Sequence, residues 1–401
     1  MKKLFEELRF METADVVIVG GGVIGTSIAY RLAGNRKVVL IEKGEIGAET
    51  SGSCDKAIFL QSKKPGFPIK LAQESRMVYE NLEEELGMNI EFQKNGGMIV
   101  IENESHLDFM RKFVKQQNKA DINVKLVDQK EALAFQPCLS PGIVGATYST
   151  VDAEVNPLLL TRAFAEAAKR KGLIIRRHTE VTGIVTKDSR VIAVQTNDGR
   201  IETELVINAA GPFAPKIAEM VGIGLPIIPR RGVILISEKV KPIVHGNILC
   251  SQYIAAKHLS NNTDVPSYGI GLSLGQTESG NLLIGGSREF KGYDKAVEPK
   301  ILSAVAMHAR RIAPSLEPVR IIRAMVGFRP FTSDGLPIIS EVPHLKGFII
   351  AAGHEGDGIA LAPITGLLVA SLVNKDLKYK DFLDQLQLDR FNASHASPKQ
   401  G

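Results

Sequence analysis

Residues 15–25 read Asp-Val-Val-Ile-Val-Gly-Gly-Gly-Val-Ile-Gly. A short β-branched run stops at glycines and an apolar stretch follows, which is the pattern of a buried strand that turns tightly into a helix. In the spacing of Gly20, Gly22 and Gly25, the first glycine makes the turn, the second lets backbone approach a pyrophosphate, and the third lets helix and strand pack closely. The N-terminus of such a helix carries partial positive charge and free N–H groups, so the stretch predicts a diphosphate site.

An acidic residue follows the next strand of the pattern. Residues 37–41 form a second β-branched run that ends at Glu42, about twenty residues after Gly20. A carboxylate there can accept hydrogen bonds from a ribose diol and would repel a 2′-phosphate, which favours an adenine dinucleotide with a free 2′-hydroxyl over NADP. The other interpretation of Glu42 is a solvated charge at a strand end. Because strand, turn, helix, strand and acid occur in order, we predict dinucleotide binding.

Composition limits the class of protein. The chain has 401 residues, 44% of them hydrophobic, which is enough for two domains. The net charge of +5 and the lack of a long basic block do not indicate a nucleic-acid partner. Cys54, Cys138 and Cys250 are too far apart to suggest a CxxC metal site or a disulfide framework, so a reducing cytoplasm is expected. No apolar run reaches the roughly 18 residues of a transmembrane helix.

Strand-into-glycine patterns recur along the chain. They appear again at residues 205–211 and 348–353, whereas residues 226–290 contain antiparallel-looking strands, and a helix is expected over residues 69–87. We therefore expect an α/β fold in which a Rossmann-like domain is interleaved with a substrate domain on a mostly antiparallel sheet. The expected division assigns residues 12–85, 150–215 and 325–385 to the dinucleotide domain, 86–149 and 216–324 to the substrate domain, 1–11 to an N-terminal extension and 386–401 to a C-terminal tail.

Further motifs extend the pattern over nearly the whole chain. They are Gly-Ala-Glu-Thr-Ser-Gly-Ser-Cys at 47–54, Asn-Ala-Ala-Gly at 208–211, Gly-Phe-Arg-Pro at 327–330 with Ser-Asp-Gly-Leu-Pro at 333–337, and Gly-His-Glu-Gly-Asp-Gly-Ile at 353–359. In this order the motifs resemble those of the FAD-dependent amine and amino-acid oxidoreductases of the D-amino-acid oxidase superfamily. That group includes glycine oxidase, sarcosine oxidase, the flavoprotein subunit of hydrogen cyanide synthase, and proline or hydroxyproline dehydrogenases.

The resemblance implies FAD as cofactor and a set of residues that contact it. The expected contacts are Gly20, Gly22, Val23, Ile24, Gly25, Glu42, Lys43, Thr50, Ser51, Ser53, Cys54, Val181, Ala209, Ala210, Gly211, Gly327, Gly353, Gly356, Asp357, Gly358 and Ile359. The second glycine-rich turn, at 353–359, precedes a helix whose N–H groups would stabilise the negative charge of a reduced flavin. Without the resemblance, Thr50, Ser51 and Ser53 are equally well explained as part of a polar turn, and Val181 as a residue of the hydrophobic core.

Arg329 is the expected substrate anchor. It lies in the segment that resembles the Gly-Leu-Arg-Pro pattern of glycine oxidase, and arginine binds a carboxylate bidentately. The competing interpretation is a salt bridge to a protein carboxylate. His354 is expected to act at the substrate or flavin, or else to cap the helix, and Tyr253 to line the pocket or pack in the core. His308, which has no partner at metal-ligand spacing, is expected at the surface, and no metal site is expected.

Two departures from the relatives bear on the cofactor and the substrate. Residues 324–327 lack the cysteine, and the loop 43–62 lacks the histidine, through which some relatives attach FAD covalently, so non-covalent FAD is expected. The chain has no tryptophan, and Met325 stands where glycine oxidase-like chains have one.

The resemblance implies oxidation of a Cα–N bond in a small amino acid or secondary amine of the glycine, sarcosine, D-amino-acid or proline type. Hydride would pass from Cα to flavin N5, and the imine would hydrolyse. The alternatives are a flavoprotein subunit that passes electrons to a partner in a heteromeric dehydrogenase, an NAD(P)H-dependent flavin hydroxylase, an NAD-dependent dehydrogenase, and a scaffold subunit. Partner subunits or a homo-oligomer are compatible with the pattern.

Overall fold

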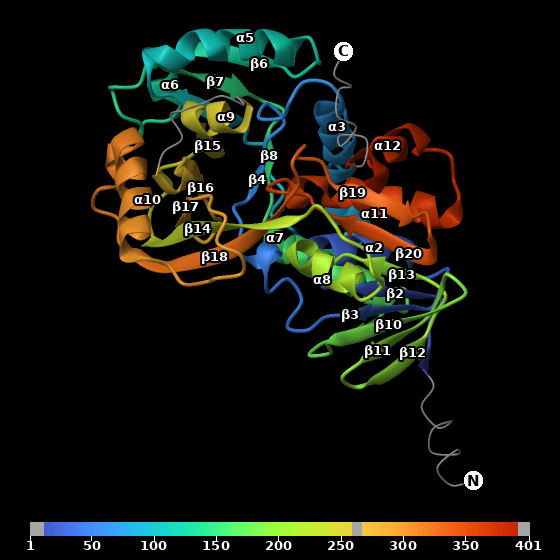
Figure 1. The fold of residues 1–401 in the computed structure, drawn as a ribbon. Helices are drawn as coiled ribbons and strands as arrows, with labels where there is room; N and C mark the ends of the chain where they lie inside the picture. The colour runs from blue at the N-terminus through green and yellow to red at the C-terminus, as the bar shows by residue number, and fades with distance from the viewer. Residues whose placement is uncertain (1–11, 259–266, 392–401) are drawn as a thin grey trace, which may run out of the picture.

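The computed structural model describes residues 12–258 and 267–391 of the chain. The expected N-terminal extension, residues 1–11, and the end of the expected tail, residues 392–401, lie outside the described residues. Two large β-sheets lie in different parts of the molecule, and a two-stranded sheet lies between them (Figure 1).

The larger sheet has ten strands within the described ranges, and its centre is parallel. Strands β20, β13, β2, β3 and β9 run side by side in that order. Strands β10, β11 and β12 form an antiparallel ribbon beside them. The bounds are Glu12–Thr13 (β1), Val16–Val19 (β2), Val38–Ile41 (β3), Ile174–Arg176 (β9), Val181–Lys187 (β10), Arg190–Thr196 (β11), Gly199–Glu202 (β12), Val206–Asn208 (β13), Ile338–Val342 (β19) and Leu345–Ala352 (β20).

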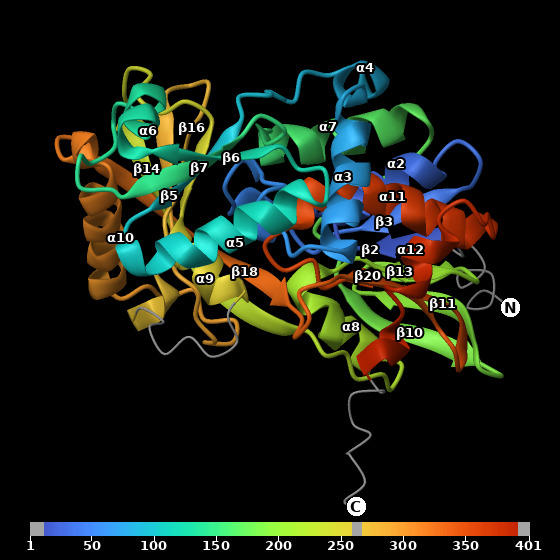
Figure 2. The same ribbon diagram turned by 90° about the horizontal axis from the view of Figure 1, so that it is seen from above.

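Both faces of the parallel centre are covered, which explains why its strands are apolar throughout. In β2, Val16 and Ile18 pack against helices on one face, whereas Val17 and Val19 pack under the antiparallel ribbon on the other. Figure 2 shows these helices on one side of β2 and β3, with β10 and β11 on the opposite side. The helices are Val23–Leu32 (α2), Phe67–Tyr79 (α3), Pro157–Arg170 (α7) and Gly358–Asn374 (α11), and Ala214–Glu219 (α8) packs on the ribbon side.

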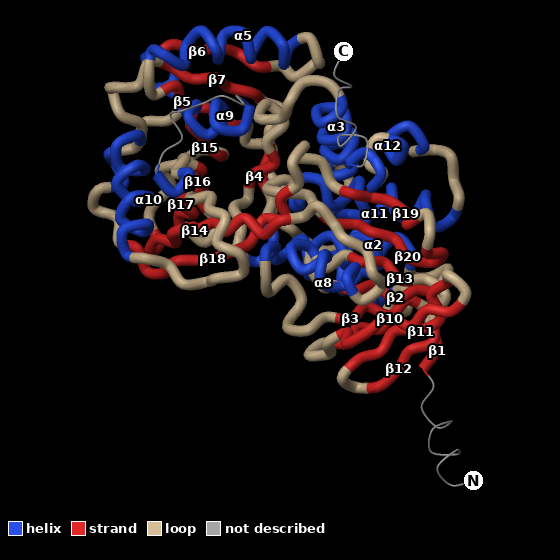
Figure 3. Tube along the Cα trace, viewed as in Figure 1, coloured by secondary structure: helices blue, strands red, loops and turns tan. Residues whose placement is uncertain are grey.

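The second sheet has eight strands within the described ranges and is mostly antiparallel. Figure 3 shows its strands, in red, apart from those of the larger sheet. Its order is β18-β14-β17-β16-β15-β5-β7-β6, and only the pair β15 and β5 is parallel. Helix α10 covers one face, and α5 and α9 cover the other. The bounds are Gly97–Ile101 (β5), Leu107–Asn118 (α5), Val124–Asp128 (β6), Gly145–Ser149 (β7), Ile228–Lys239 (β14), Asn247–Cys250 (β15), Ser251–His258 (α9), Ser273–Gln276 (β16), Asn281–Gly285 (β17), Pro299–Ile312 (α10) and Ile321–Phe331 (β18).

Buried polar contacts surround the small sheet between the two large ones. Its strands are Ala57–Ile58 (β4) and Ala153–Glu154 (β8). Lys56 and Glu154 form an ion pair of 2.9 Å, and both side chains are buried. Asp152 accepts a hydrogen bond from the Gln61 side chain at 2.6 Å, and burial raises the pKa of Asp152 to about 6. These contacts satisfy polar groups that the junction would otherwise bury without partners.

The expected mixed α/β fold, with a Rossmann-like part and a mostly antiparallel part, is confirmed. The expected helix over residues 69–87 is interrupted: α3 ends at Tyr79, and a short helix, Leu82–Leu86 (α4), ends at Gly87, whose φ of +59° is left-handed. The division into two domains stays a prediction, and β18 runs across the boundary that we expected at residue 325. The remaining helices are Gln129–Phe135 (α6) and Lys380–Asp384 (α12).

The contact between α2 and β2 gives a first test. A Cβ at Gly25 would lie 1.9 Å from the carbonyl oxygen of Gly20, so Gly25→Ala must push helix and strand apart. We expect a loss of about 1–3 kcal/mol from overpacking, which exceeds the gain of about 1 kcal/mol in helix propensity. Urea unfolding measures the difference.

The matched control is Gly224→Ala, because a Cβ at Gly224 meets no atom within 4 Å. We expect this variant to unfold at the wild-type urea concentration. Equal midpoints for the two variants would contradict the proposed close packing at Gly25.

Candidate active site

A cavity of about 720 Å³ lies where the parallel strands end. The residues at the carboxyl ends of β2, β3 and β13 line it, and so do residues of β14 and β18 from the second sheet. In open α/β sheets, ligands bind in the crevice outside the carboxyl ends of the strands. The volume falls in the range of about 300–1,000 Å³ that is common for small-molecule sites.

Most of the residues predicted from the sequence line this cavity. They are Gly20, Gly22, Val23, Ile24, Glu42, Lys43, Thr50, Ser51, Ser53, Cys54, Val181, Ala209, Ala210, Gly211, Tyr253, Gly327, Arg329, His354, Gly356, Gly358 and Ile359. Three residues predicted as cofactor contacts, Gly25, Gly353 and Asp357, are not among the residues that line it, and their contact with the cofactor stays a prediction. Gly25 and Gly353 shape the two glycine turns.

The first glycine turn brings α2 against the strand ends. Gly20 has a φ of +113°, which is left-handed backbone, and a Cβ there would lie 2.5 Å from the carbonyl oxygen of Ala209. Gly25 touches the carbonyl of Gly20, as described above. At the N-terminus of α2, the Val23 N–H donates to Ser51 Oγ at 3.0 Å. The Ser51 hydroxyl therefore lies at the positive end of the helix, where the sequence placed the diphosphate.

The Glu42 carboxylate accepts hydrogen bonds from backbone N–H groups of two loops. Its Oε2 accepts from the Gly21 N–H and its Oε1 from the Gly44 N–H, both at 2.7 Å. Each carboxylate oxygen can accept a second hydrogen bond, so these contacts orient the carboxylate without using its full capacity. The solvated charge that was the alternative interpretation is excluded, because Glu42 lines the cavity and bridges two loops.

The loop 47–54 packs against β18. Thr50 Oγ1 donates to the Phe328 carbonyl at 2.7 Å, and a Cβ at Gly327 would meet Ser53 at 3.0 Å. Cys54 Sγ donates to the Ser51 carbonyl at 3.2 Å, and burial raises the pKa of this thiol. The loop thus joins the helix end of the first sheet to the strand that carries Arg329.

The second glycine turn is held by ion pairs that the sequence did not predict. Gly353, at the end of β20, has a φ of +88°. Asp357 forms an ion pair of 2.6 Å with Lys63 and points to this partner instead of lining the cavity. Glu355 forms an ion pair with Arg230 of β14. Both acids of the turn are therefore neutralised by side chains from other segments.

His354 is buried, and its tautomer follows from its contacts. Thr365 Oγ1 donates its hydrogen to the Leu361 carbonyl at 2.8 Å, so at 3.0 Å it accepts from His354 Nε2. The lone pair of a neutral His354 ring then lies on Nδ1. Burial lowers the pKa of His354 to about 3, which keeps the imidazole neutral at ordinary pH.

Arg329 lies over a glycine. A Cβ at Gly232, on the neighbouring strand β14, would lie 2.1 Å from Arg329 Nη1. Nη1 donates to the Ser287 carbonyl at 3.2 Å, and within the described ranges no carboxylate pairs with this guanidinium. The structural salt bridge, which was the competing interpretation of Arg329, is therefore not seen there. Burial, and then the charge of Arg288, lower the pKa of Arg329.

Sequence reasoning missed Arg230, Arg288 and Glu355. Arg288 Cζ lies 3.5 Å from the centre of the Tyr253 ring, and Tyr253 lines the cavity. One sequence signal could have indicated Arg230: it lies two residues before Gly232, the glycine under Arg329. In the structure Arg230 is opposite Arg329 in the β14–β18 pair.

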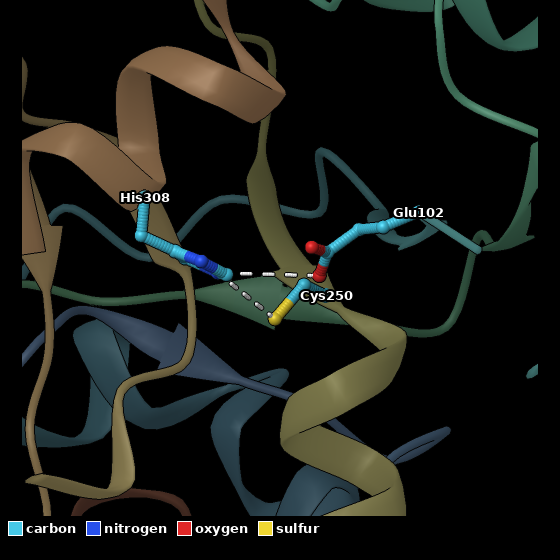
Figure 4. Close-up of side chains that lie close together, drawn as sticks. All are labelled: Glu102, Cys250 and His308. Atoms are coloured by element: carbon cyan, nitrogen blue, oxygen red, sulfur yellow. Dashed lines mark hydrogen bonds and ion pairs between the residues drawn. The ribbon is translucent and has the colours of Figure 1, made fainter. Parts of the chain in front are cut away.

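His308 is not at the surface, so that expectation was wrong. Figure 4 shows it with Cys250 and Glu102: His308 Nε2 lies 3.7 Å from Cys250 Sγ and 4.0 Å from Glu102 Oε1. None of the three residues lines the cavity. Arg311 donates to His308 Nδ1 at 3.1 Å. A neutral ring then carries its hydrogen on Nε2, the atom that a metal would need, so the cluster is a hydrogen-bonding group in this arrangement.

Comparison with known proteins agrees with the motifs and the cavity. The family model described as FAD dependent oxidoreductase (DAO) matches residues 15–372. The chain belongs to this family. The predicted cofactor and enzyme class are thereby confirmed: the protein is an FAD-dependent oxidoreductase.

Individual relatives cover almost the whole chain. Glycine oxidase of Geobacillus kaustophilus is 30% identical and the alignment covers 90% of this chain and 93% of the relative. Hydrogen cyanide synthase subunit HcnC of Pseudomonas aeruginosa is 28% identical, with 91% and 93% covered. The structure of L-proline dehydrogenase from P. horikoshii superposes with a TM-score of 0.86 at 27% identity, covering 96% of this chain and 99% of that one.

The cavity fits the cofactor of the family. Glycine backbone and the N-terminus of α2 suit a diphosphate, and Glu42 suits a ribose. In the part of the chain that the structure describes, no helix is long and apolar enough to cross a membrane. The cytoplasmic location stays a prediction.

The neutral His354 gives a test in the stability of the protein. An ordinary histidine has a pKa of 6.5, so lowering it to about 3 means that the unfolded chain binds a proton that the folded chain does not. Between these values, stability falls as the pH falls, by up to about 1.4 kcal/mol per pH unit. We expect His354→Gln, which cannot titrate, to lose this part of the slope between pH 6.5 and 4.

Urea unfolding of the wild-type and His354→Gln holoenzymes across this pH range measures how the free energy of unfolding of each changes with pH. Contributions from other titrating groups, which both proteins share, cancel in the difference. Parallel slopes would show that His354 takes up a proton in the folded state, which would contradict a buried neutral ring.

Proposed function

We propose that the protein oxidises the Cα–N bond of a small amino acid or secondary amine whose carboxylate is held by Arg329. The observation that supports this most directly is a guanidinium that lines the cavity, is positioned by Gly232 and the Ser287 carbonyl, and forms no ion pair with a carboxylate of the described residues. A planar guanidinium binds a carboxylate through two parallel hydrogen bonds, which fixes the orientation of the substrate as well as its position. Relatives named glycine oxidase and L-proline dehydrogenase support the substrate class.

Bound FAD would act as the two-electron acceptor for a hydride from Cα. The amine nitrogen would lose a proton to solvent, and the imine would add water to give a carbonyl and an amine. The contribution of the chain is position and charge. Arg329 would orient Cα through the carboxylate, and the N-terminus of α11 would offer N–H groups to the negative charge of the reduced cofactor. His354, neutral and fixed by Thr365, offers the Nδ1 lone pair as a hydrogen-bond acceptor.

We further propose that FAD is held without a covalent bond. Among the described residues Cys54 is the cysteine that lines the cavity, and its half-buried thiol, with a raised pKa, is a poor nucleophile. Acid precipitation of the holoenzyme should leave the flavin in the supernatant. Flavin that stays with the precipitated chain would contradict this proposal.

The reaction class is tested by anaerobic mixing of the yellow holoenzyme with single candidates. We expect glycine, sarcosine, a D-amino acid, proline or hydroxyproline to bleach the visible flavin absorbance, and NADH or NADPH to leave it unchanged. Bleaching by a nicotinamide alone would favour a flavin hydroxylase instead. Reoxidation by oxygen, compared with reoxidation by a dye, then separates an oxidase from a dehydrogenase.

A second candidate is the same chemistry within a heteromeric enzyme. It is favoured by the relative named as a subunit of hydrogen cyanide synthase. In that case reduced holoenzyme should reoxidise slowly in air and rapidly with a dye.

Arg329→Met tests the anchor. Because a hydrogen bond to a charged group contributes about 1.5–3 kcal/mol, we expect kcat/KM for amino acids to fall about 10- to 100-fold, with FAD content unchanged. Arg323→Met is the matched control, since Arg323 lies on the same strand with its side chain exposed. Normal amino-acid turnover in Arg329→Met would remove the anchor from the proposal.

A further inference from the structure

Three arginines share one face of the strands beside the cavity. Arg230 of β14 lies directly opposite Arg329 of β18, and opposed residues of an antiparallel pair point to the same face. Arg231 points to the other face, where it forms an ion pair of 3.0 Å with Glu289, and both side chains are almost fully buried. Arg231 and Glu289 also exchange backbone hydrogen bonds, so Arg288 returns to the face of Arg230 and Arg329.

Protein carboxylates neutralise one of these three guanidinium groups. Arg230 pairs with Glu355. The Arg288 guanidinium lies over the Tyr253 ring, and its Nε is buried without a hydrogen-bond partner. Among the described residues, neither Arg288 nor Arg329 forms an ion pair with a carboxylate.

The other acids of the cavity lining are already engaged. Glu42 accepts from two backbone N–H groups, Glu49 pairs with Lys295, Glu180 pairs with Lys43, and Asp55 accepts from the Ser273 hydroxyl at 2.6 Å. The arginines also repel one another: burial, followed by the charges of Arg288 and Arg329, lowers the pKa of Arg230 to about 9. Among the described residues, the neighbouring guanidinium groups of Arg288 and Arg329 thus remain without an ion pair to a carboxylate, and Asp55 acts on Arg329 through its charge alone.

We propose that Arg288 forms a second anion subsite beside Arg329, and that the substrate is an amino or imino acid with two carboxylates, one on each guanidinium. This inference rests on the proposed function, because Arg329 must hold the first carboxylate. A side-chain or N-linked carboxylate that reaches Arg288 would lie against the Tyr253 ring and would supply the charge and hydrogen bonds that the described residues do not provide.

Matched substrate pairs test the proposal on the wild-type holoenzyme. Iminodiacetate and sarcosine share a secondary amine and differ by one carboxylate, and the enantiomers of aspartate and asparagine differ in the same way. We expect kcat/KM for the better dicarboxylate to exceed that of its partner by about 10- to 100-fold, the worth of a charged hydrogen bond. Equal or better use of the monocarboxylates would overturn the second subsite and leave the proposed function intact.

Arg288→Met assigns the effect to the residue. We expect it to reduce kcat/KM for the dicarboxylate about 10- to 100-fold and to leave the monocarboxylate within about threefold. Arg288→Lys, which keeps the charge, should recover part of the loss, and Arg323→Met should change neither. An equal loss of kcat/KM for both substrates would mean that Arg288 and Arg329 bind the same carboxylate, which would overturn the proposal.

Binding without turnover gives an independent readout. Malonate or succinate, followed by the shift of the flavin spectrum, should bind the wild type more tightly than acetate by about tenfold or more, and this advantage should disappear in Arg288→Met. If dicarboxylates bind in this way but no amine reduces the flavin, the proposed function fails while the anion subsite stands. If neither preference appears, the subsite is wrong.

Discussion

The site depends on one close approach, that of the Gly25 backbone to the Gly20 carbonyl. With no side chain at either position, α2 begins directly above the end of β2, and the carbonyl of Ala209 from the next strand can lie against the same turn. The turn between β2 and α2 thus meets the end of β13, which is distant in sequence, with backbone facing backbone. Any Cβ there would separate them, and the N–H groups of α2 would no longer point into the cavity where a diphosphate can use them.

Charge in the cavity is distributed between the two sheets. The acids that belong to the turns of the first sheet are each held: Glu42 by backbone N–H groups, Asp357 by Lys63, and Glu355 by Arg230 from the second sheet. The helix N-termini therefore keep their positive ends available to a ligand. The second sheet contributes the arginines, so the cofactor region and the anion-binding region are built from different parts of the chain.

Features that depend on local backbone geometry could be predicted from the sequence. A strand that stops at Gly20 and an acid after the next strand need no knowledge of distant partners, and neither does the short motif around Arg329. Lys63, Arg288 and His308 were missed or misplaced because their significance depends on residues far away in the sequence. The ion pair of Asp357 could not be predicted for the same reason, since nothing near Asp357 in the chain indicates that Lys63 is its partner.

Side chains of β14 and of the segment after β17 alternate between two faces. The residues that support the fold point to one face, and those that would contact the ligand point to the other. Arg231 and Glu289 lock the backbone from one side, and Arg288, next to Glu289 in the chain, projects from the other and forms no ion pair with the residues that the structure describes. Evolution can therefore exchange the side chain at position 288 without disturbing the frame that holds it. In a protein built this way, single substitutions can change substrate specificity while the fold stays the same.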